Sequence, residues 1–516
     1  MSATKIIDYL HDCRWCDFKK KIEDNQISSL NLEQLPFDNN RKLFIIGEVS
    51  FNDGDKRFFS MPLAIKEERP TDGKYLALGD GYYYTDATLE PDFWQSFTTF
   101  MNENNGKITF PNGWTLENSS IGGFANMMEE FPAEPSKALG VEQSNTTLKI
   151  GDGKLAFKLE RMLDFSPELN SEFEMNDKLM RENAAFMPKT FGGLIWRRPD
   201  GSQAAGGIIQ EFVKNKGDMW NYLQSMLQSK LRINYLIQRD LSAEDNPEFM
   251  QLIKTLSHRT KEMNTCLSKD DDAPEFKPEA ADKKFIDAYE KQLRVLLFQT
   301  KRDIVEKLGN LPADIAEKAK KLIIHWEEYT NNFVTPRLEA IRSGAFPTQL
   351  NRVHGDFHLG QVMVTPDNDV RFIDFAGEPA LPMRERKQKH LSVRDVAGMY
   401  RSIQGYLGAV AVEEYANKAP TPLIREERKN WGQKAIKPLI SRASQEFLGD
   451  YQLSNPWLGL EVLRKNLYEV KYEVSQRPEM AYVPIGGLYD LFGDLPYDKS
   501  REFVNDNTIS HDHRVG

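Results

Sequence analysis

The sequence is poor in the residues and runs that mark several classes of protein. Only three cysteines occur among 516 residues, Cys13, Cys16 and Cys266, which excludes a disulfide-stabilised scaffold and suits a reducing compartment. No apolar run approaches the roughly 18 residues that a membrane-spanning helix requires. The N-terminus lacks the basic stretch and apolar core of a secretory signal, so we expect a cytoplasmic protein without a membrane partner.

Positive charge is also in deficit, since 67 lysines and arginines face 77 aspartates and glutamates and leave a net charge of −10. A polyanion would be repelled at long range, which argues against nucleic acid as the main partner. The composition, 40% hydrophobic and 28% charged, is that of a globular protein and excludes a wholly disordered chain. The length predicts two or three domains, and we expect a monomer.

Two of the cysteines form a C-x-x-C spacing, which metal and redox sites also use. A structural zinc site normally needs four ligands, and the nearest further candidate is His11 alone. We therefore favour the simpler interpretation, in which Cys13 and Cys16 are small residues packed near Trp15.

The hydrophobic pattern changes from strands to helices along the chain. Alternating runs around the turn signals Asn52–Asp55 and Gly151–Gly153 predict β hairpins, and further short strands are expected up to residue 213. After Trp220 apolar residues recur at three- and four-residue steps, which predicts helices over 281–309 and 312–343 among others.

The stretch 353–379, VHGDFHLGQVMVTPDNDVRFIDFAGEP, carries the strongest chemical signal. Asp356 is followed five residues later by Gln361, and Asp374 ends an apolar strand. Phosphoryl transfer needs one carboxylate to accept the proton of the attacking hydroxyl. It also needs a second carboxylate and an amide oxygen to hold the magnesium that bridges the nucleotide phosphates. The order H-G-D-x-x-x-x-Q…D-F resembles the protein-kinase pattern H-R-D-x-x-x-x-N…D-F-G, so we predict Asp356 as the base and Gln361 and Asp374 as the magnesium ligands.

Two histidines accompany the predicted base. We expect His354 to be a buried, hydrogen-bonded residue that braces the loop rather than a catalyst. His358, two residues after Asp356, is a candidate for substrate contact and equally for the scaffold of the loop.

A kinase site also needs a lysine for the α- and β-phosphates and an acid that positions it. Lys158 lies in the apolar strand predicted at 155–160, where a charge requires a reason; the alternative is a lysine that extends from a strand edge to solvent. We expect Glu174, in the helix predicted over 170–183, to pair with Lys158, and Glu172 is a close competitor.

Two further segments fit a nucleotide. Residues 142–146 place small polar groups on a turn between strands, where hydroxyls and backbone N–H groups can wrap a triphosphate. Residues 210–213 have the pattern of a segment linking two lobes, whose backbone would meet adenine. The predicted ATP-binding residues in these segments are Gln143, Ser144, Asn145, Thr146, Gln210, Glu211, Phe212 and Val213.

Together these motifs resemble those of the bacterial maltokinases, a branch of the aminoglycoside-phosphotransferase-like kinases. The matches run in order over nearly the whole chain. They are Arg14-Trp15, Glu142–Thr146, Gly217-Asp218-x-Trp220, residues 353–379, Arg394-Asp395-Val-Ala-Gly-Met and Tyr472-Glu473…Arg477-Pro478.

The resemblance implies an ATP-dependent enzyme that phosphorylates the anomeric hydroxyl of maltose to maltose 1-phosphate for α-glucan (glycogen-type) synthesis. It implies an α+β, bilobal protein-kinase-like fold with an N-terminal β-rich cap and a mostly helical C-lobe. The expected divisions are a cap over 1–90, an intermediate region and N-lobe with the phosphate loop and Lys158 over 91–213, and a helical C-lobe with the catalytic loop over 214–516. It also implies Mg²⁺ as cofactor, ATP as donor and a small sugar as acceptor.

One helix bears on the acceptor. Glu469, Tyr472, Glu473 and Arg477 share a helix face by their spacing. On spacing alone this is a solvated face. With the resemblance it becomes a wall of the acceptor cleft, because carboxylates, the amide of Gln476 on the same face and an aromatic ring suit the hydroxyls and C–H face of a sugar. We expect Arg394 and Asp395 to brace the catalytic loop instead.

The chain departs from the family pattern at two points. Ala376 stands where the family usually has Glu after Asp-Phe, and the chain is longer than typical members, a surplus we place in 265–345. Glucosamine kinases share the architecture, so an aminosugar kinase is the alternative within the enzyme class. A non-catalytic nucleotide-binding protein with the kinase fold is the alternative outside it.

Overall fold

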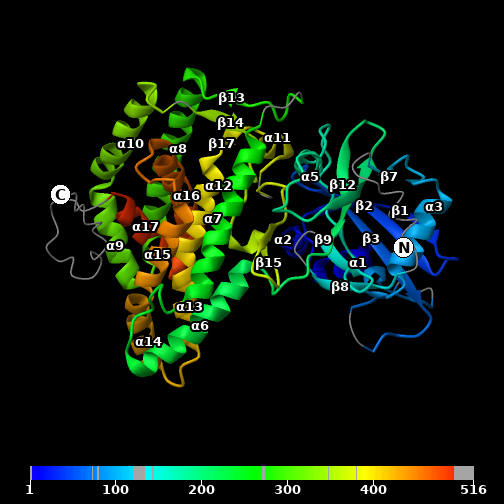
Figure 1. Cartoon of the computed structure of the whole chain (residues 1–516). Helices are drawn as coiled ribbons and strands as arrows, with labels where there is room; N and C mark the ends of the chain where they lie inside the picture. The colour runs from blue at the N-terminus through cyan, green and yellow to red at the C-terminus, as the bar shows by residue number, and fades with distance from the viewer. Residues whose placement is uncertain are drawn as a thin grey trace, which may run out of the picture. The chain divides into compact units, whose positions relative to one another are not determined.

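Figure 1 shows the computed structural model, which is rich in strands in its N-terminal part and helical in its C-terminal part. It describes residues 3–71, 74–77, 81–119, 134–141, 145–269, 273–346, 348–378 and 381–492. The chain divides into two compact units of three stretches each. These are Met1–Lys230, Ala243–Glu279 and Leu350–Asp395 in the first, and Leu231–Ser242, Ala280–Gln349 and Val396–Gly516 in the second. Among the described residues, no helix is both long and apolar enough to cross a membrane.

The first sheet of the first unit has the strand order β1-β2-β3-β5-β4. β2 and β3 pair antiparallel around the Asn52–Asp55 turn, which confirms the predicted hairpin. β1, which the sequence pattern did not indicate, is joined to β2 by a turn in which Asp38, Asn39 and Asn40 have positive φ. The elements are α1 (Ala3–Asp12), α2 (Lys19–Glu23), β1 (Ile27–Phe37), β2 (Lys42–Phe51), β3 (Lys56–Lys66), β4 (Leu76–Ala77) and β5 (Tyr83–Asp86).

The two helices and this sheet share an apolar cluster. Trp15 lies in it together with Cys13 and Cys16, and all three are buried. Burial raises the pKa of the Cys13 thiol to about 12 and that of the Cys16 thiol to about 11. Thiols of this kind stay protonated at neutral pH and behave as small core residues, as we predicted for this pair.

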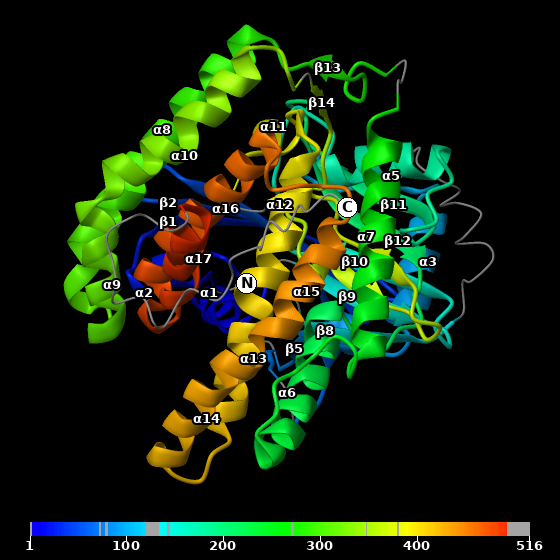
Figure 2. The same ribbon diagram turned by 60° about the vertical axis from the view of Figure 1, so that its left-hand side comes forward.

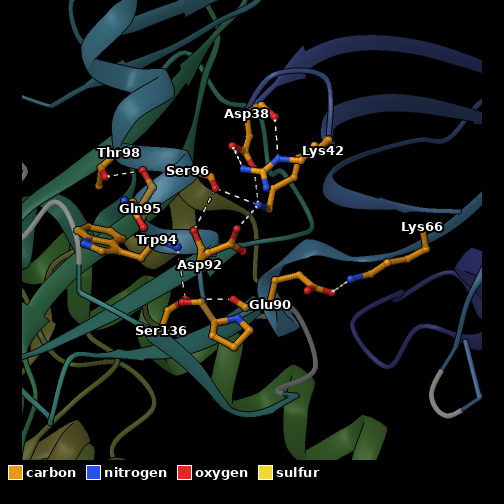
Figure 3. Close-up of polar contacts among 12 residues, drawn as sticks. Asp38, Lys42, Lys66, Glu90, Asp92, Trp94, Gln95, Ser96, Thr98 and Ser136 are labelled. Carbon is orange, nitrogen blue, oxygen red and sulfur yellow. Dashed lines mark hydrogen bonds and ion pairs between the residues drawn. The ribbon is translucent and has the colours of Figure 1, made fainter.

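A buried lysine ties β2 to the next helix, α3 (Phe93–Glu103), as Figure 3 shows. Lys42 Nζ donates to Asp38 at 2.6 Å, to Asp92 at 2.9 Å and to the Ser96 hydroxyl at 2.9 Å. Burial would raise the pKa of Asp38, but Lys42 and Arg41 outweigh burial and lower it. A charge that is 3% exposed is tolerated only with such partners, so this cluster fixes the position of α3.

The second sheet is antiparallel, with the order β6-β7-β11-β12-β10-β9-β8. One apolar core, to which Phe44, Trp94, Phe157 and Trp196 belong, joins both sheets to α3. The hairpin of β9 and β10 confirms the prediction around Gly151–Gly153. The strands are β6 (Lys107–Thr109), β7 (Thr115–Asn118), β8 (Ser136–Val141), β9 (Asn145–Ile150), β10 (Leu155–Glu160), β11 (Thr190–Arg197) and β12 (Gln203–Glu211).

The remaining elements of the first unit include those around the segment 353–379. β15 and β16 form a two-stranded hairpin, and β14 pairs with β17. Arg259 of α7 donates two charge-assisted hydrogen bonds, at 2.9 and 2.6 Å, to Asp369 in the turn between β15 and β16. The elements are α5 (Ser171–Arg181), α7 (Pro247–Leu267), β14 (Gln349–Asn351), β15 (Val362–Val364), β16 (Val370–Phe372), α11 (Met383–Arg386) and β17 (His390–Leu391).

The second unit is helical. α16 is buried along most of its length and packs on α8, α10 and α17, while α13 and α14 form a hairpin (Figure 2). Two helices, α6 (Met219–Ile237) and α12 (Val393–Arg401), run from the first unit into the second. The other helices are α8 (Lys283–Lys307), α9 (Ala313–Ile324), α10 (Trp326–Arg342), α13 (Gly408–Asn417), α14 (Pro422–Ala435), α15 (Lys437–Leu448), α16 (Pro456–Gln476) and α17 (Tyr482–Phe492).

The helical prediction needs one refinement. The segment 312–343 is two helices, because the chain leaves helical geometry at His325, with φ −100° and ψ 13°, between α9 and α10. A π-helical stretch, Ser402–Leu407, precedes α13 and has no periodicity signal of its own.

Candidate active site

Asp374 lies at the centre of the predicted site. It follows β16 and has φ +65°, an uncommon conformation outside glycine. Oδ1 accepts from Lys158 Nζ at 3.0 Å, and Oδ2 accepts from Gln361 Nε2 at 3.3 Å. The Lys158 charge lowers the pKa of Asp374, although burial opposes the shift. Lys158 therefore meets two residues of the stretch 353–379 here, and its charge favours the ionised carboxylate of Asp374.

Lys158 lies on β10 with a side chain that is 16% exposed. Its Nζ is 3.3 Å from Glu172 and 3.7 Å from Glu160, besides Asp374. Burial alone would lower the pKa of Lys158, but the three carboxylates outweigh burial and hold it well above its usual value. A cation fixed by acids in this way is a suitable partner for phosphate oxygens.

The expected pairing of Glu174 with Lys158 is wrong, and the competitor Glu172 takes that place. α5 begins at Ser171 with Asn170 as its N-cap, so the two glutamates are two residues, or about 200°, apart around the helix. Glu172 faces Lys158, while Glu174 accepts from Arg352 Nη1 at 2.8 Å and contacts Lys387 at 2.6 Å. No sequence signal shows which of the two faces Lys158, because both glutamates lie in the first turn of the helix.

The loop that contains the predicted base is held by Asp395 and by the segment before Asp374. His354 is fully buried, its backbone N–H donates to Asp395 at 2.8 Å, and the Gly355 N–H donates to the same carboxylate at 3.0 Å. His354 Nε2 donates to the Ile373 carbonyl at 3.0 Å, which connects the loop to the residue before Asp374. Burial raises the pKa of Asp395, although His354 and the two N–H groups oppose the shift. Arg394 lies beside His390, with Nη1 2.9 Å from Nδ1.

Asp356 itself projects from the loop with a side chain that is 24% exposed. Its Oδ2 lies 3.9 Å from His358 Nε2. His358 Nδ1 also accepts from the Gly360 N–H at 3.1 Å and so caps the short turn that leads to Gln361. His358 therefore stabilises the loop through Nδ1, while its Nε2 lies beside the predicted base Asp356.

The predicted phosphate turn is described only in part, because Gln143 and Ser144 lie outside the described residues. Asn145 and Thr146 begin β9 and are buried. The Thr146 hydroxyl accepts from Arg161 Nε at 3.0 Å, and Arg161 Nη2 donates to Asp86 at 2.6 Å. Sequence reasoning missed Arg161, whose full burial at the end of β10 attaches the end of the turn to the last residue of β5.

The predicted adenine segment follows from the end of β12. Gln210 turns inward, with Nε2 donating to Asn176 at 2.9 Å and to Thr190 at 3.1 Å. Its neighbours make backbone contacts that fix the strand end: the Glu211 N–H donates to the Lys189 carbonyl and the Phe212 N–H to that of Lys154. The Val213 carbonyl accepts from the Asn215 side chain at 2.6 Å.

The donor set at Asp374 fits magnesium, which prefers carboxylate and amide oxygens. Within the described ranges, no three or more His, Cys, Asp and Glu residues gather as a self-sufficient metal site. Asp374 and Gln361 would therefore hold the cation together with phosphate oxygens and water, as magnesium sites of nucleotide enzymes commonly do.

The predicted acceptor residues lie on α16 in the second unit. Glu469 accepts from Arg401 Nη2 at 2.8 Å, and Glu473 accepts from Arg477 at 2.6 Å and from the Tyr406 hydroxyl at 3.1 Å. Both glutamates are buried, whereas Tyr472 is 48% exposed. The spacing alone suggested a solvated helix face. The face is not solvated throughout, because Glu469 and Glu473 are buried and hydrogen-bonded.

Comparison with known proteins finds a similar curated sequence and similar solved structures. No family model matches the chain. A glucosamine kinase of Streptacidiphilus jiangxiensis is 31% identical over 147 residues, which are 28% of this chain and 32% of that protein. The chain thus spans about a third of the length of the curated relative that it matches.

The similarity to solved structures extends over far more of the chain than the sequence match does. Crystal form B of a glucosamine kinase superposes with a TM-score of 0.55 and 18% identity, over 91% of this chain and 95% of that one. A glucosamine kinase in complex with glucosamine, ADP and inorganic phosphate superposes with a TM-score of 0.52 and 17% sequence identity. The superposition covers 91% of this chain and 95% of that one. The chain therefore has the fold of these kinases, with a β-rich N-terminal part and a helical C-terminal part.

Proposed function

We propose that the protein is an ATP-dependent sugar kinase and that its acceptor is an amino sugar of the glucosamine type. The observation that carries the proposal is the meeting of Lys158, Asp374 and Gln361, with Asp356 on a loop that is tied to the same segment. The glucosamine kinase relative favours the amino sugar over the maltose expected from the motifs.

The residues have separate tasks in the transfer. Asp356 accepts the proton of the acceptor hydroxyl while that oxygen attacks the γ-phosphorus and the bond to ADP breaks. Lys158, charged at any working pH, binds phosphate oxygens of ATP. Asp374 and Gln361 would hold magnesium, which would supply positive charge to neutralise the phosphates. Asp395 keeps the loop in place through its two backbone hydrogen bonds.

Maltose is the second candidate acceptor, because the ordered motifs from Arg14-Trp15 to Arg477-Pro478 resemble those of maltokinases. Glu473 and Arg477 stay proposed acceptor contacts on these sequence grounds, as does the division into cap, N-lobe and C-lobe at residues 90 and 213. Ala376 stands at the position where the resembling sequences carry a further acid, so we expect acceptor preference to depend on it.

A panel of sugars tests the proposal. Glucosamine, maltose and glucose are offered with magnesium and ATP, ADP release is measured, and NMR of the product locates the phosphate. Turnover that is fastest with glucosamine supports the amino sugar, and fastest turnover with maltose supports the second candidate. A thermal shift with magnesium-ATP but no turnover on any sugar would instead indicate a non-catalytic nucleotide-binding protein.

A further inference from the structure

One buried arginine connects the helix beside Lys158 to the catalytic loop. Arg352 is 1% exposed, and its Nη1 donates to Glu174 while Nη2 donates to the Ser171 hydroxyl, both at 2.8 Å. The guanidinium also lies 5.4 Å from the centre of the Phe276 ring. A planar fork with two anchored donors fixes orientation as well as distance, which a lysine cannot do.

The anchored residues lie on either side of Glu172. Ser171 and Glu174 are in the first turn of α5, and Glu172 between them contacts Lys158. The same turn is capped by Asn170, whose Oδ1 accepts from the Glu172 N–H at 2.8 Å. A shift of this turn would therefore move the Glu172 carboxylate away from the lysine that holds Asp374.

The other end of the connection is the loop that carries the base. Arg352 follows β14 directly and precedes His354 by two residues and Asp356 by four. Asp395 and the Ile373 carbonyl hold His354 in turn. The path from Glu172 to Asp356 thus runs through the first turn of α5, the two hydrogen bonds of Arg352 and the four residues of chain that follow Arg352.

We infer that Arg352 and Glu174 are positioning residues that keep the Lys158–Glu172 pair aligned with the catalytic loop. The inference rests on the proposed kinase function for its kinetic consequence. Lys387 shares the Glu174 carboxylate at 2.6 Å, and the Ser171 N–H donates to the Met383 sulfur at 3.3 Å, so the segment around α11 supports the same turn. Arg352 is the member of this group that is next to the catalytic loop in sequence.

The test uses Glu174→Gln and Arg352→Lys in the full chain. Each substitution keeps the approximate shape of the side chain and weakens the hydrogen bonds between Arg352 and α5. We expect kcat to fall about 10- to 100-fold, because a displacement of about 1 Å in an active site can lower the rate about 100-fold. We expect the KM for ATP to rise and the KM for sugar to change far less. Lys389→Gln is the matched control: it removes a lysine paired with Glu279 in the same unit, and we expect no change in kcat or KM.

A double variant separates positioning from general stability. If Glu174 acts through Glu172, Glu174→Gln added to Glu172→Gln should cost less than about a further 3-fold, since residues in one chain of contacts are not additive. Full additivity, or an unchanged KM for ATP in both single variants, would overturn the inference. Ser171→Ala, which removes only one hydroxyl, gives the same comparison should Arg352→Lys fold poorly.

Hydrogen exchange gives a readout that does not depend on turnover. We expect Glu174→Gln to speed exchange both in the first turn of α5 and in residues 351–356, whereas Lys389→Gln should change neither. Faster exchange in α5 alone would mean that the contact does not couple the two segments and would refute the inference. Wild-type protein without turnover on any sugar would refute the proposed function, while the exchange comparison would still decide the coupling.

Discussion

Replacing Asp374 separates the metal-binding charge from the backbone conformation. Asp374 has φ +65°, which Asn tolerates about as well as Asp but Ala does not, so Asp374→Asn removes the charge without added strain. Asp374→Ala removes the same charge and adds a backbone cost of about 1–2 kcal/mol. We expect both variants to lose magnesium-dependent ATP binding, and only the Ala variant to carry the extra instability.

The electrostatic magnitude follows from the structure. Lys158 Nζ and Asp374 Oδ1 are 3.0 Å apart, which corresponds to about 5 kcal/mol of attraction at an effective dielectric of 20. Desolvation offsets much of this, and Asp374 is 36% exposed, so a net loss of about 1–2 kcal/mol is expected after screening. Glu172 and Glu160 stay near Lys158 and limit the penalty of an unpaired cation.

The assay is chemical unfolding over pH combined with titration of magnesium-ATP. The folded pKa of Asp374 is lowered, so its contribution to stability is present above the unfolded pKa, about 3.9, and is lost as the pH falls through the lower folded pKa. Asp374→Asn should therefore be less stable than wild type at neutral pH and approach it in strong acid. Magnesium-ATP affinity equal to wild type in both variants would refute the metal assignment, and equal stability of the Ala and Asn variants would refute the backbone argument.

The other predictions concern the base, its loop, the acceptor helix and the hairpin behind the site. Asp356→Asn should lower kcat by about 10²–10⁴-fold and leave ATP binding intact, since the amide cannot accept the hydroxyl proton; turnover near wild type would contradict this. Asp395→Ala removes the acceptor of two backbone N–H groups and should lower the free energy of unfolding by about 1–3 kcal/mol for each group; a stability within experimental error of wild type would argue that Asp395 does not brace the loop. Glu473→Gln or Arg477→Ala should raise the KM for sugar by about 5- to 150-fold and change that for ATP far less, at about 1–3 kcal/mol per lost polar partner; an unchanged sugar KM would assign the pair to structure alone. Arg259 and Arg371 lower the pKa of Asp369 against the effect of burial, so its stabilising effect is lost in acid, and Asp369→Asn should flatten the acid limb of the stability profile.

The sequence predicted the elements that local chemistry specifies. The Asn52–Asp55 and Gly151–Gly153 turns lie between strands because their residues accept turn conformations, and the order Asp356, Gln361, Asp374 places three polar groups around one hairpin. The strands and helices around these motifs were therefore predictable, and so was the assignment of Lys158 and Asp374 to one site, but their direct contact was not predicted.

The features that the sequence did not reveal depend on how a helix is rotated about its axis and on side-chain contacts between residues far apart in sequence. The choice between Glu172 and Glu174 depends on how α5 is rotated about its axis relative to Lys158, which sequence periodicity does not show. Arg161 and Arg352 have no motif; each is recognisable only when its buried guanidinium is seen to join segments far apart in sequence. Glu469 and Glu473 are likewise paired with Arg401 and Tyr406, which lie outside this helix, and only Arg477 belongs to the face pattern.

The interleaving of the two units has a consequence for how the chain can be divided. The boundaries fall after Lys230, Ser242, Glu279, Gln349 and Asp395. A fragment ending at residue 230 would keep Lys158 and Glu172 but lack Asp356, Gln361 and Asp374, while a fragment beginning at residue 231 would have the base and the metal ligands without the lysine. Limited proteolysis within either unit should therefore abolish function without releasing an active half. Insertions are better tolerated at exposed turns inside one stretch than at the crossings, because every crossing joins two separate cores.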